Sequence, residues 1–162
     1  MVLSIINIIL LVLLLAFSVN IIEKIIKEKR DKISFKESMD LTDLPIITLY
    51  NGKTKINFLL DTGSNLSHIN RSYLDNLEYQ DLNIEQDTIG MEGNKITSKV
   101  CKIQVFYKEN KYEEEFVASD LDNAFNTIKQ ESGVQIHGIL GSKFFEKYKY
   151  VLDFSNLTAY VK

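Results

Sequence analysis

The sequence predicts a mostly β domain with one short helix near its C-terminus, preceded by an apolar N-terminal helix. Three observations lead to this fold class. Short runs of alternating apolar and polar residues extend from Leu44 to the C-terminus, which is the period of half-buried strands. Asn51-Gly52 stands between two such runs, and this dipeptide is the strongest local indication of a β-hairpin. Residues 2–22 contain no charged side chain.

The apolar stretch at 2–22 is long enough for a membrane span. About 20 helical residues cross the roughly 30 Å hydrocarbon core of a bilayer. A cleaved signal peptide is the alternative, but no Lys or Arg precedes the apolar run and no Ala-x-Ala sequence ends it. We therefore expect residues 1–22 to be a retained transmembrane anchor, in contact with the lipid bilayer through residues 2–22.

The segment 23–43 is expected to be a juxtamembrane stalk followed by a linker. Its first part is rich in basic residues, Lys24, Lys27, Lys29, Arg30 and Lys32, whereas no Lys or Arg precedes the apolar run. Because basic residues favour the cytoplasmic side, a single-pass protein with a cytoplasmic domain is predicted. Export of the same domain to the other side of the membrane is the alternative.

The remaining residues, 44–162, are expected to form one domain, whose elements follow from local patterns. The expected elements, in order, are a hairpin at 45–60, a strand ending in a helical turn at 65–77, a glycine-tipped hairpin at 87–107, a turn at 108–112, a strand at 113–120, a loop or short helix at 121–132, a helix at 141–148 and one or two strands at 150–162. Ser142 is the expected N-cap of the helix.

Composition narrows the function classes. The chain has a net charge of −3 and no basic patch, which argues against a nucleic-acid partner. Cys101 is the only cysteine, so the chain cannot form an internal disulfide. It lies in an alternating strand, where a buried structural thiol is the expected role.

Three sequence features whose residues could take part in catalysis occur in a fixed order. An apolar strand runs into Asp61, and Thr62, Gly63 and Ser64 follow it at once. The glycine-tipped hairpin comes next, and Ile139, Leu140 and Gly141 then precede the last helix. A carboxylate at the end of a buried strand is costly unless it is paired or reaches water. Asp61 therefore either caps an ordinary turn or is placed there for chemistry.

In this order the features resemble those of retroviral-type (retropepsin-like) aspartic proteases, over about residues 44–162. The sequence "LLDTGS" resembles the catalytic motif of the family, "ILG" at 139–141 its second hydrophobic-hydrophobic-glycine element, and "TIGMEGNKI" at 88–96 its flap. The resemblance implies a closed β-barrel lobe with a flap hairpin and a short C-terminal helix.

The resemblance also implies a function, that of a membrane-anchored homodimeric aspartic endopeptidase. Asp61 of each chain would meet beside a two-fold axis, and a water between the two carboxylates would attack the peptide bond of a protein or peptide substrate. No metal or other cofactor is required. A non-catalytic, membrane-tethered peptide-binding or dimerisation module of the same fold is the alternative, and an accidental Asp-Thr-Gly turn is a third.

The same resemblance implies roles for the residues that follow Asp61 and for the flap tip. Thr62 would bond to the partner's backbone, Gly63 would let the chain turn beneath the carboxylates, and Ser64 would steady the outer carboxylate oxygen. The expected flap tip, which would close over an extended substrate, consists of Gly90, Met91, Glu92 and Gly93.

Four other features are expected to be structural. His68 and His137 are not needed by an aspartic mechanism, so both are expected to serve the fold. Asp153 is expected to end a strand in a turn. Residues 112–116, "YEEEF", are expected to form the solvated face of a strand.

Overall fold

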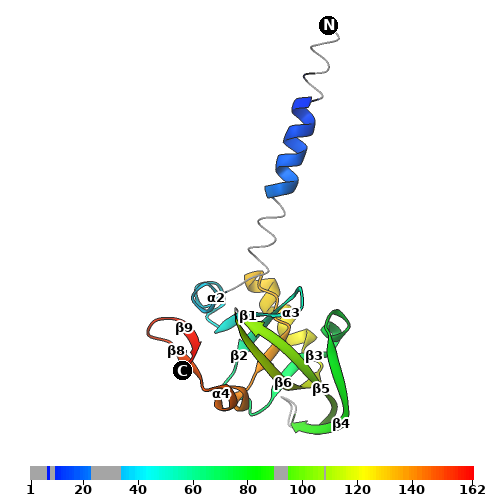
Figure 1. Cartoon of the computed structure of the whole chain (residues 1–162), viewed down its shortest axis with the longest axis vertical. Helices are drawn as coiled ribbons and strands as arrows, with labels where there is room; N and C mark the ends of the chain where they lie inside the picture. The colour runs from blue at the N-terminus through cyan, green and yellow to red at the C-terminus, as the bar shows by residue number, and fades with distance from the viewer. Residues whose placement is uncertain (1–6, 8–9, 23–33, 90–94, 108) are drawn as a thin grey trace. The chain divides into compact units, whose positions relative to one another are not determined.

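The structure is a computed structural model that describes residues 7, 10–22, 34–89, 95–107 and 109–162. The chain divides into two compact units, residues 1–31 and residues 32–162. The second unit contains all the labelled strands (Figure 1).

The membrane prediction for the first unit is wrong. Residues 10–22 are helical and their side chains are exposed. Within the described ranges, no helix is both long enough and apolar enough to span a membrane. The expected transmembrane helix, and with it a single-pass membrane location with the domain on the cytoplasmic or the exported side, is overturned.

The second unit is built on a closed barrel of six strands, which confirms the mostly β prediction. The strands follow one another around the ring as β1 (Ile46–Asn51), β2 (Thr54–Leu60), β7 (Gly138–Leu140), β3 (Ser67–Asn70), β6 (Asn110–Ser119) and β5 (Lys95–Tyr107). The ring closes where Tyr50 of β1 pairs with Phe106 of β5. A further strand, β4 (Tyr79–Ile89), continues the sheet beyond β5.

Both predicted hairpins form. Antiparallel pairing of β1 with β2 leaves Gly52 and Lys53 as the connecting residues, and Gly52 has the positive φ of +56° that such a turn favours. Strands β4 and β5 pair along their length with a bulge between Asp81 and Ile84. The expected flap tip joins these two strands, and its residues Gly90, Met91, Glu92 and Gly93 lie outside the described residues.

The domain holds more helix than the one short C-terminal helix that was predicted. That helix is present as α4 (Ser142–Tyr148), with Gly141 rather than Ser142 at the N-cap position. Residues 121–132 were expected to form either a loop or a short helix, and the structure contains a helix there, α3 (Asp122–Ser132). A 3-10 helix, η1 (Arg71–Asn76), follows β3.

Helix α2 (Phe35–Thr42) lies within the expected linker. Ser34 caps it by accepting a hydrogen bond from the backbone N–H of Glu37, at 3.3 Å. Phe35 is buried in the main core with Leu49 and Phe58. A Ser-x-x-Glu capping box before an apolar face is a sequence signal for a helix start, and it is present at 34–37.

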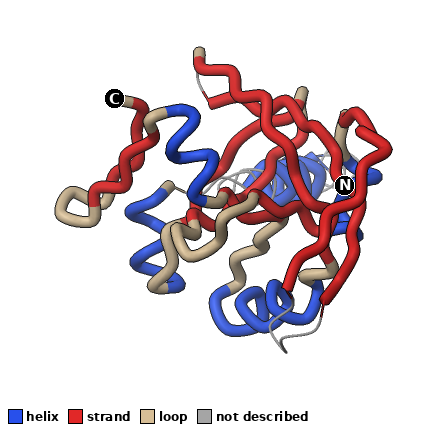
Figure 2. The backbone as a smooth tube through the Cα atoms, turned by 90° about the horizontal axis from the view of Figure 1, so that it is seen from below, coloured by secondary structure: helices blue, strands red, loops and turns tan. Residues whose placement is uncertain are grey.

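The last two strands form a sheet separate from that of the barrel. Strands β8 (Tyr150–Asp153) and β9 (Thr158–Val161) form a hairpin of their own, which extends from the other strands beside the C-terminus (Figure 2). The Asp153 carboxylate accepts hydrogen bonds from the backbone N–H groups of Ser155 and Asn156. This bonding confirms that Asp153 caps a turn at the end of a strand.

Candidate active site

Asp61 directly follows β2 and is held by backbone groups. Its own N–H donates to the carbonyl oxygen of Leu140 at 3.0 Å, and the N–H of Gly63 donates to its Oδ1 at 2.8 Å. The side chain remains partly exposed. The second bond is one that an ordinary aspartate turn also makes, so the significance of the loop depends on what surrounds it.

Strand β7 brings the second motif to this loop. It runs parallel to β2, with Leu140 opposite Leu60, and antiparallel to β3, with Ile139 opposite His68. Because β2 enters the Asp61 loop and β3 leaves it, β7 lies between the two arms of the loop. Residues 61–64 and 139–141, which are far apart in the sequence, therefore meet.

Gly141 packs directly against the loop. A Cβ atom on Gly141 would lie 2.3 Å from the carbonyl oxygen of Leu66 and 2.9 Å from that of Ser64. The next residue, Ser142, donates its N–H to the Ser64 carbonyl oxygen at 2.7 Å. Only glycine permits so close an approach of two backbones, which explains the glycine of this motif.

The three residues that follow Asp61 differ in their exposure and contacts. Thr62 is exposed on the turn. A Cβ atom on Gly63 would lie 3.1 Å from Oδ1 of Asp61. The hydroxyl of Ser64 donates to the Leu66 carbonyl oxygen at 2.8 Å. The hydrogen bond that Oδ1 of Asp61 accepts comes from Gly63, and the expected role of Ser64 at the outer carboxylate oxygen stays a prediction.

His68 is closer to the site than the sequence indicates. Its ring is partly buried, and Nδ1 lies 2.9 Å from the hydroxyl oxygen of Ser119. Burial lowers the pKa of His68, whereas the negative charge of Asp61 acts in the opposite direction. The charge of Asp61 therefore acts on the His68 ring. The only sequence signal for this was the position of His68 on the strand that leaves the motif.

The other two expected structural side chains have local partners. His137 accepts a hydrogen bond at Nδ1 from the backbone N–H of Asn57, at 2.9 Å, and its ring centroid lies 4.0 Å from that of Tyr73. Cys101 is buried, and burial raises the pKa of its thiol to about 11. Both structural roles are confirmed.

The run of three glutamates is not uniformly solvated. Glu113 and Glu115 are exposed, as expected, but Glu114 is only 6% exposed. Side chains alternate between the two faces of β6, and Glu114 shares the inward face with Tyr112 and Phe116, both of which are buried. The prediction of a solvated face is therefore wrong for Glu114.

Comparisons with known structures define the fold. The chain is similar to EIAV protease in its complex with the inhibitor HBY-793, with 18% sequence identity and a TM-score of 0.51, over 68% of this chain and 93% of that chain. It also matches the solution structure of simian foamy virus (mac) protease, with 14% identity and a TM-score of 0.42, over 62% and 91% of the respective chains. No protein-family model and no curated protein sequence matches the chain.

The likeness to EIAV protease shows that the chain has a retropepsin-like fold. This is the fold that the order of the sequence motifs predicts.

Proposed function

We propose that the protein is a homodimeric aspartic endopeptidase that hydrolyses peptide bonds. The observation that carries the proposal is the Asp61 loop, whose carboxylate is held by Gly63 and whose backbone packs on Gly141, within a retropepsin-like barrel. An Asp-Thr-Gly turn alone would be weak support. Its contact with the Ile-Leu-Gly strand makes the support specific.

The chemistry requires two carboxylates, and the sequence contains a single Asp-Thr-Gly. A two-fold dimer supplies the second acid when both Asp61 loops approach the axis. Two carboxylates this close cannot both be ionised, so they share one proton. The ionised carboxylate removes a proton from a bound water, which attacks the scissile carbonyl carbon. The protonated carboxylate donates to the carbonyl oxygen, and proton return to the amine completes the cleavage.

Two surfaces suit the proposed dimer. Thr62 is exposed beside Asp61, so its hydroxyl can bond to the partner's loop. Strand β9 pairs with β8 alone among the described strands and exposes Tyr160 and Val161. A second copy would cover these apolar side chains and continue the hairpin.

The proposed substrate is an extended segment of protein or peptide. Such a segment can bind by adding a strand to the site, with backbone hydrogen bonds for affinity and side-chain pockets for selectivity. The β4–β5 hairpin is the proposed flap that closes over it. The role of its tip, residues 90–93, in closing over the substrate is inferred from the resemblance to the retropepsin-like flap.

The first test is cleavage of a diverse peptide library by the full chain between about pH 4 and pH 7. Wild type is compared with Asp61→Asn and with Asp153→Asn, which removes a carboxylate from another strand end. We expect cleavage by wild type and Asp153→Asn, and none by Asp61→Asn. Equal cleavage by Asp61→Asn would refute the mechanism, and peptide binding without cleavage by a folded wild-type dimer would favour a binding module.

A mixing experiment tests the dimer separately. If each active site needs both Asp61 residues, tenfold excess Asp61→Asn chain captures most wild-type chains in inactive pairs. After subunit exchange the activity per wild-type chain should fall to roughly one-tenth. Activity that is independent of the added variant, with exchange shown by ultracentrifugation of labelled chains, would exclude a shared site.

A further inference from the structure

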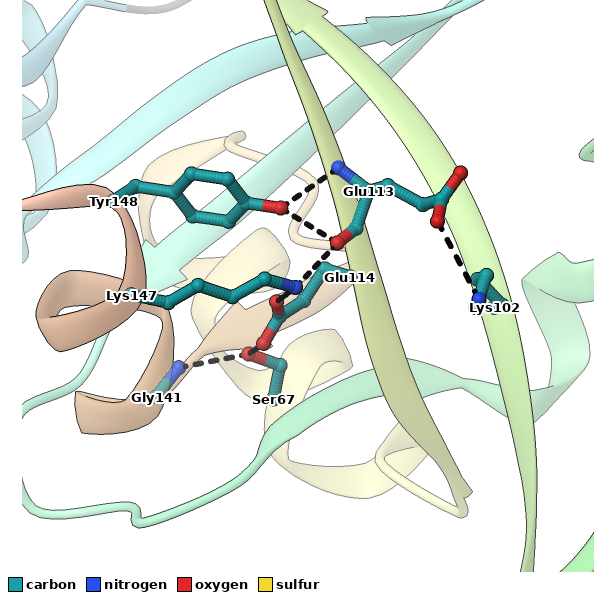
Figure 3. A network of polar contacts seen from close by, with 7 residues as sticks. All are labelled: Ser67, Lys102, Glu113, Glu114, Gly141, Lys147 and Tyr148. Carbon is teal, nitrogen blue, oxygen red and sulfur yellow. Dashed lines mark hydrogen bonds and ion pairs between the residues drawn. The ribbon is translucent and has the colours of Figure 1, made fainter.

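A buried polar network connects the candidate active site to helix α4. Figure 3 shows Lys147 and Tyr148 of α4 extending toward β6, with Ser67 lying between Glu114 and Gly141. The Ser67 hydroxyl donates to Oε1 of Glu114 at 3.3 Å, and Lys147 Nζ donates to Oε2 at 3.1 Å. The N–H of Gly141 donates to Oγ of Ser67 at 3.2 Å.

Helix α4 is also bound to the backbone of β6. Lys147 Nζ and the Tyr148 hydroxyl each donate to the carbonyl oxygen of Glu113 at 2.6 Å, and the Glu113 N–H donates to the Tyr148 oxygen at 2.8 Å. These bonds fix the position of Lys147, and through it one oxygen of the Glu114 carboxylate. The other oxygen is thereby directed at Ser67.

The network reaches Asp61 through the segment 140–142. This segment makes three hydrogen bonds with the Asp61 loop and the first residue of β3: Leu140 accepts from Asp61, Gly141 donates to Ser67, and Ser142 donates to Ser64. The Gly141 bond differs from the other two because its acceptor is a side chain. A hydroxyl can rotate, so this bond requires something that holds the Ser67 hydroxyl in place.

Glu114 meets that requirement. Ser67 has one hydroxyl proton, and an ionised carboxylate is a strong acceptor for it. Once the proton points at Glu114, the lone pairs of Oγ are left for the N–H of Gly141. We propose that Glu114 is a positioning residue, which orients Ser67 and thereby fixes Gly141 against the Asp61 loop.

The charges in the network are arranged for this role. The Glu114 side chain is 7% exposed and that of Lys147 is 51% exposed. A buried carboxylate needs a partner of opposite charge, and Lys147 supplies it. Burial lowers the pKa of Lys147, but its interactions with Glu114 and Tyr148 together outweigh burial and raise the pKa overall, so Lys147 stays charged at neutral pH.

The test compares Glu114→Ala, Glu114→Gln and the exposed neighbour Glu115→Ala. Its kinetic part rests on the proposed function. Glu114→Ala should lower kcat at least about tenfold with little change in KM, because it misplaces the loop rather than removing a substrate contact. The glutamine variant offers one oxygen to two donors, and the charged Lys147 ammonium is the stronger of the two. Its NH2 group should therefore face Ser67, so Glu114→Gln should also lower kcat, by at least about threefold. Glu115→Ala should leave kcat and KM unchanged.

A double-mutant cycle adds a sharper criterion. Ser67→Ala should reduce kcat about as much as Glu114→Ala, and the double variant should show no further loss, because both changes remove the same bond. Additive losses would overturn the proposal, as would equal kcat in folded Glu114→Ala and wild type.

Amide hydrogen exchange separates this inference from the proposed function. In Glu114→Ala the Gly141 amide should exchange at least about tenfold faster than in wild type, with no such change in Glu115→Ala. If wild type cleaves no peptide, the protease proposal fails, and exchange at Gly141 still decides the inference. An unchanged rate at Gly141 in folded Glu114→Ala would overturn it.

Discussion

Gly141 and Leu66 approach so closely that a Cβ atom on Gly141 would lie 2.3 Å from the Leu66 carbonyl oxygen and 2.6 Å from its carbonyl carbon. Both neighbouring atoms belong to the backbone, so neither can move without moving the loop that carries Asp61. Gly141→Ala should therefore lower the free energy of unfolding by about 3 kcal/mol and abolish any activity that depends on Asp61. Urea denaturation and peptide cleavage measure the two effects.

Gly133 is the matched control for this substitution. It has a positive φ of +75°, but a Cβ atom there would have no neighbour within 4 Å. Gly133→Ala should cost about 1 kcal/mol of unfolding free energy, from backbone strain alone, and leave activity intact. Equal losses in the two variants would mean that the contact with Leu66 is not what requires glycine at 141.

Local patterns predict much of the barrel because its hairpins are local. Asn51-Gly52 between two alternating runs is enough to place β1 and β2. The barrel type came from the family resemblance that the three motifs carry. The position of β7 between β2 and β3 is different. It depends on pairing between residues about 80 positions apart, which no local pattern encodes.

The sequence-based predictions that differ from the structure do so for specific reasons. Three consecutive glutamates resemble a solvated run, although the alternation of β6 places Glu114 on the same face as Tyr112 and Phe116. There it contacts Ser67 and Lys147. The charged run before Pro45 reads as a linker, although the Ser34 capping box begins a helix there. Residues 2–22 have the composition of a membrane span, but within the described part of the chain no helix is long and apolar enough to be one.

Cys101 should be unreactive in the folded protein. Its side chain is buried, and burial raises the thiol pKa to about 11. At pH 8 about one thiol in a thousand is then ionised, and the thiolate is the reactive form. A maleimide or disulfide reagent should modify Cys101 slowly in buffer and within the mixing time in urea, as followed by mass spectrometry. Rapid modification under native conditions would contradict the burial of this thiol.

The coupling of His68 to its surroundings should appear in the pH dependence of stability. Burial holds the pKa of His68 below its ordinary value of 6.5, despite the opposing charge of Asp61. Below pH 6.5 the unfolded chain therefore binds a proton that the folded chain does not, so stability falls as the pH falls toward the folded-state pKa. Above pH 6.5 both states are neutral at this residue and the effect vanishes.

His68→Gln removes this titration and keeps a polar side chain. The urea midpoint of the wild type should decrease more than that of the variant between pH 7.5 and pH 5. Parallel decreases in both proteins would show that His68 does not titrate differently in the folded and unfolded states. The Ser119 hydroxyl, which lies 2.9 Å from Nδ1, is the main side-chain contact that the substitution alters besides the charge.

Helix α2 should contribute to the stability of the barrel domain through Phe35. The Phe35 ring is 3% exposed and lies in the main core, where it also meets Phe154 of the β8–β9 turn edge to face, with centroids 5.2 Å apart. Phe35→Ala should lower the free energy of unfolding by about 3 kcal/mol or more, from lost burial and the cavity that remains. Leu41 of the same helix is 53% exposed, so Leu41→Ala should cost less than about 0.5 kcal/mol. Thermal or urea unfolding of the two variants makes the comparison, and similar losses from both would show that α2 is not docked through Phe35.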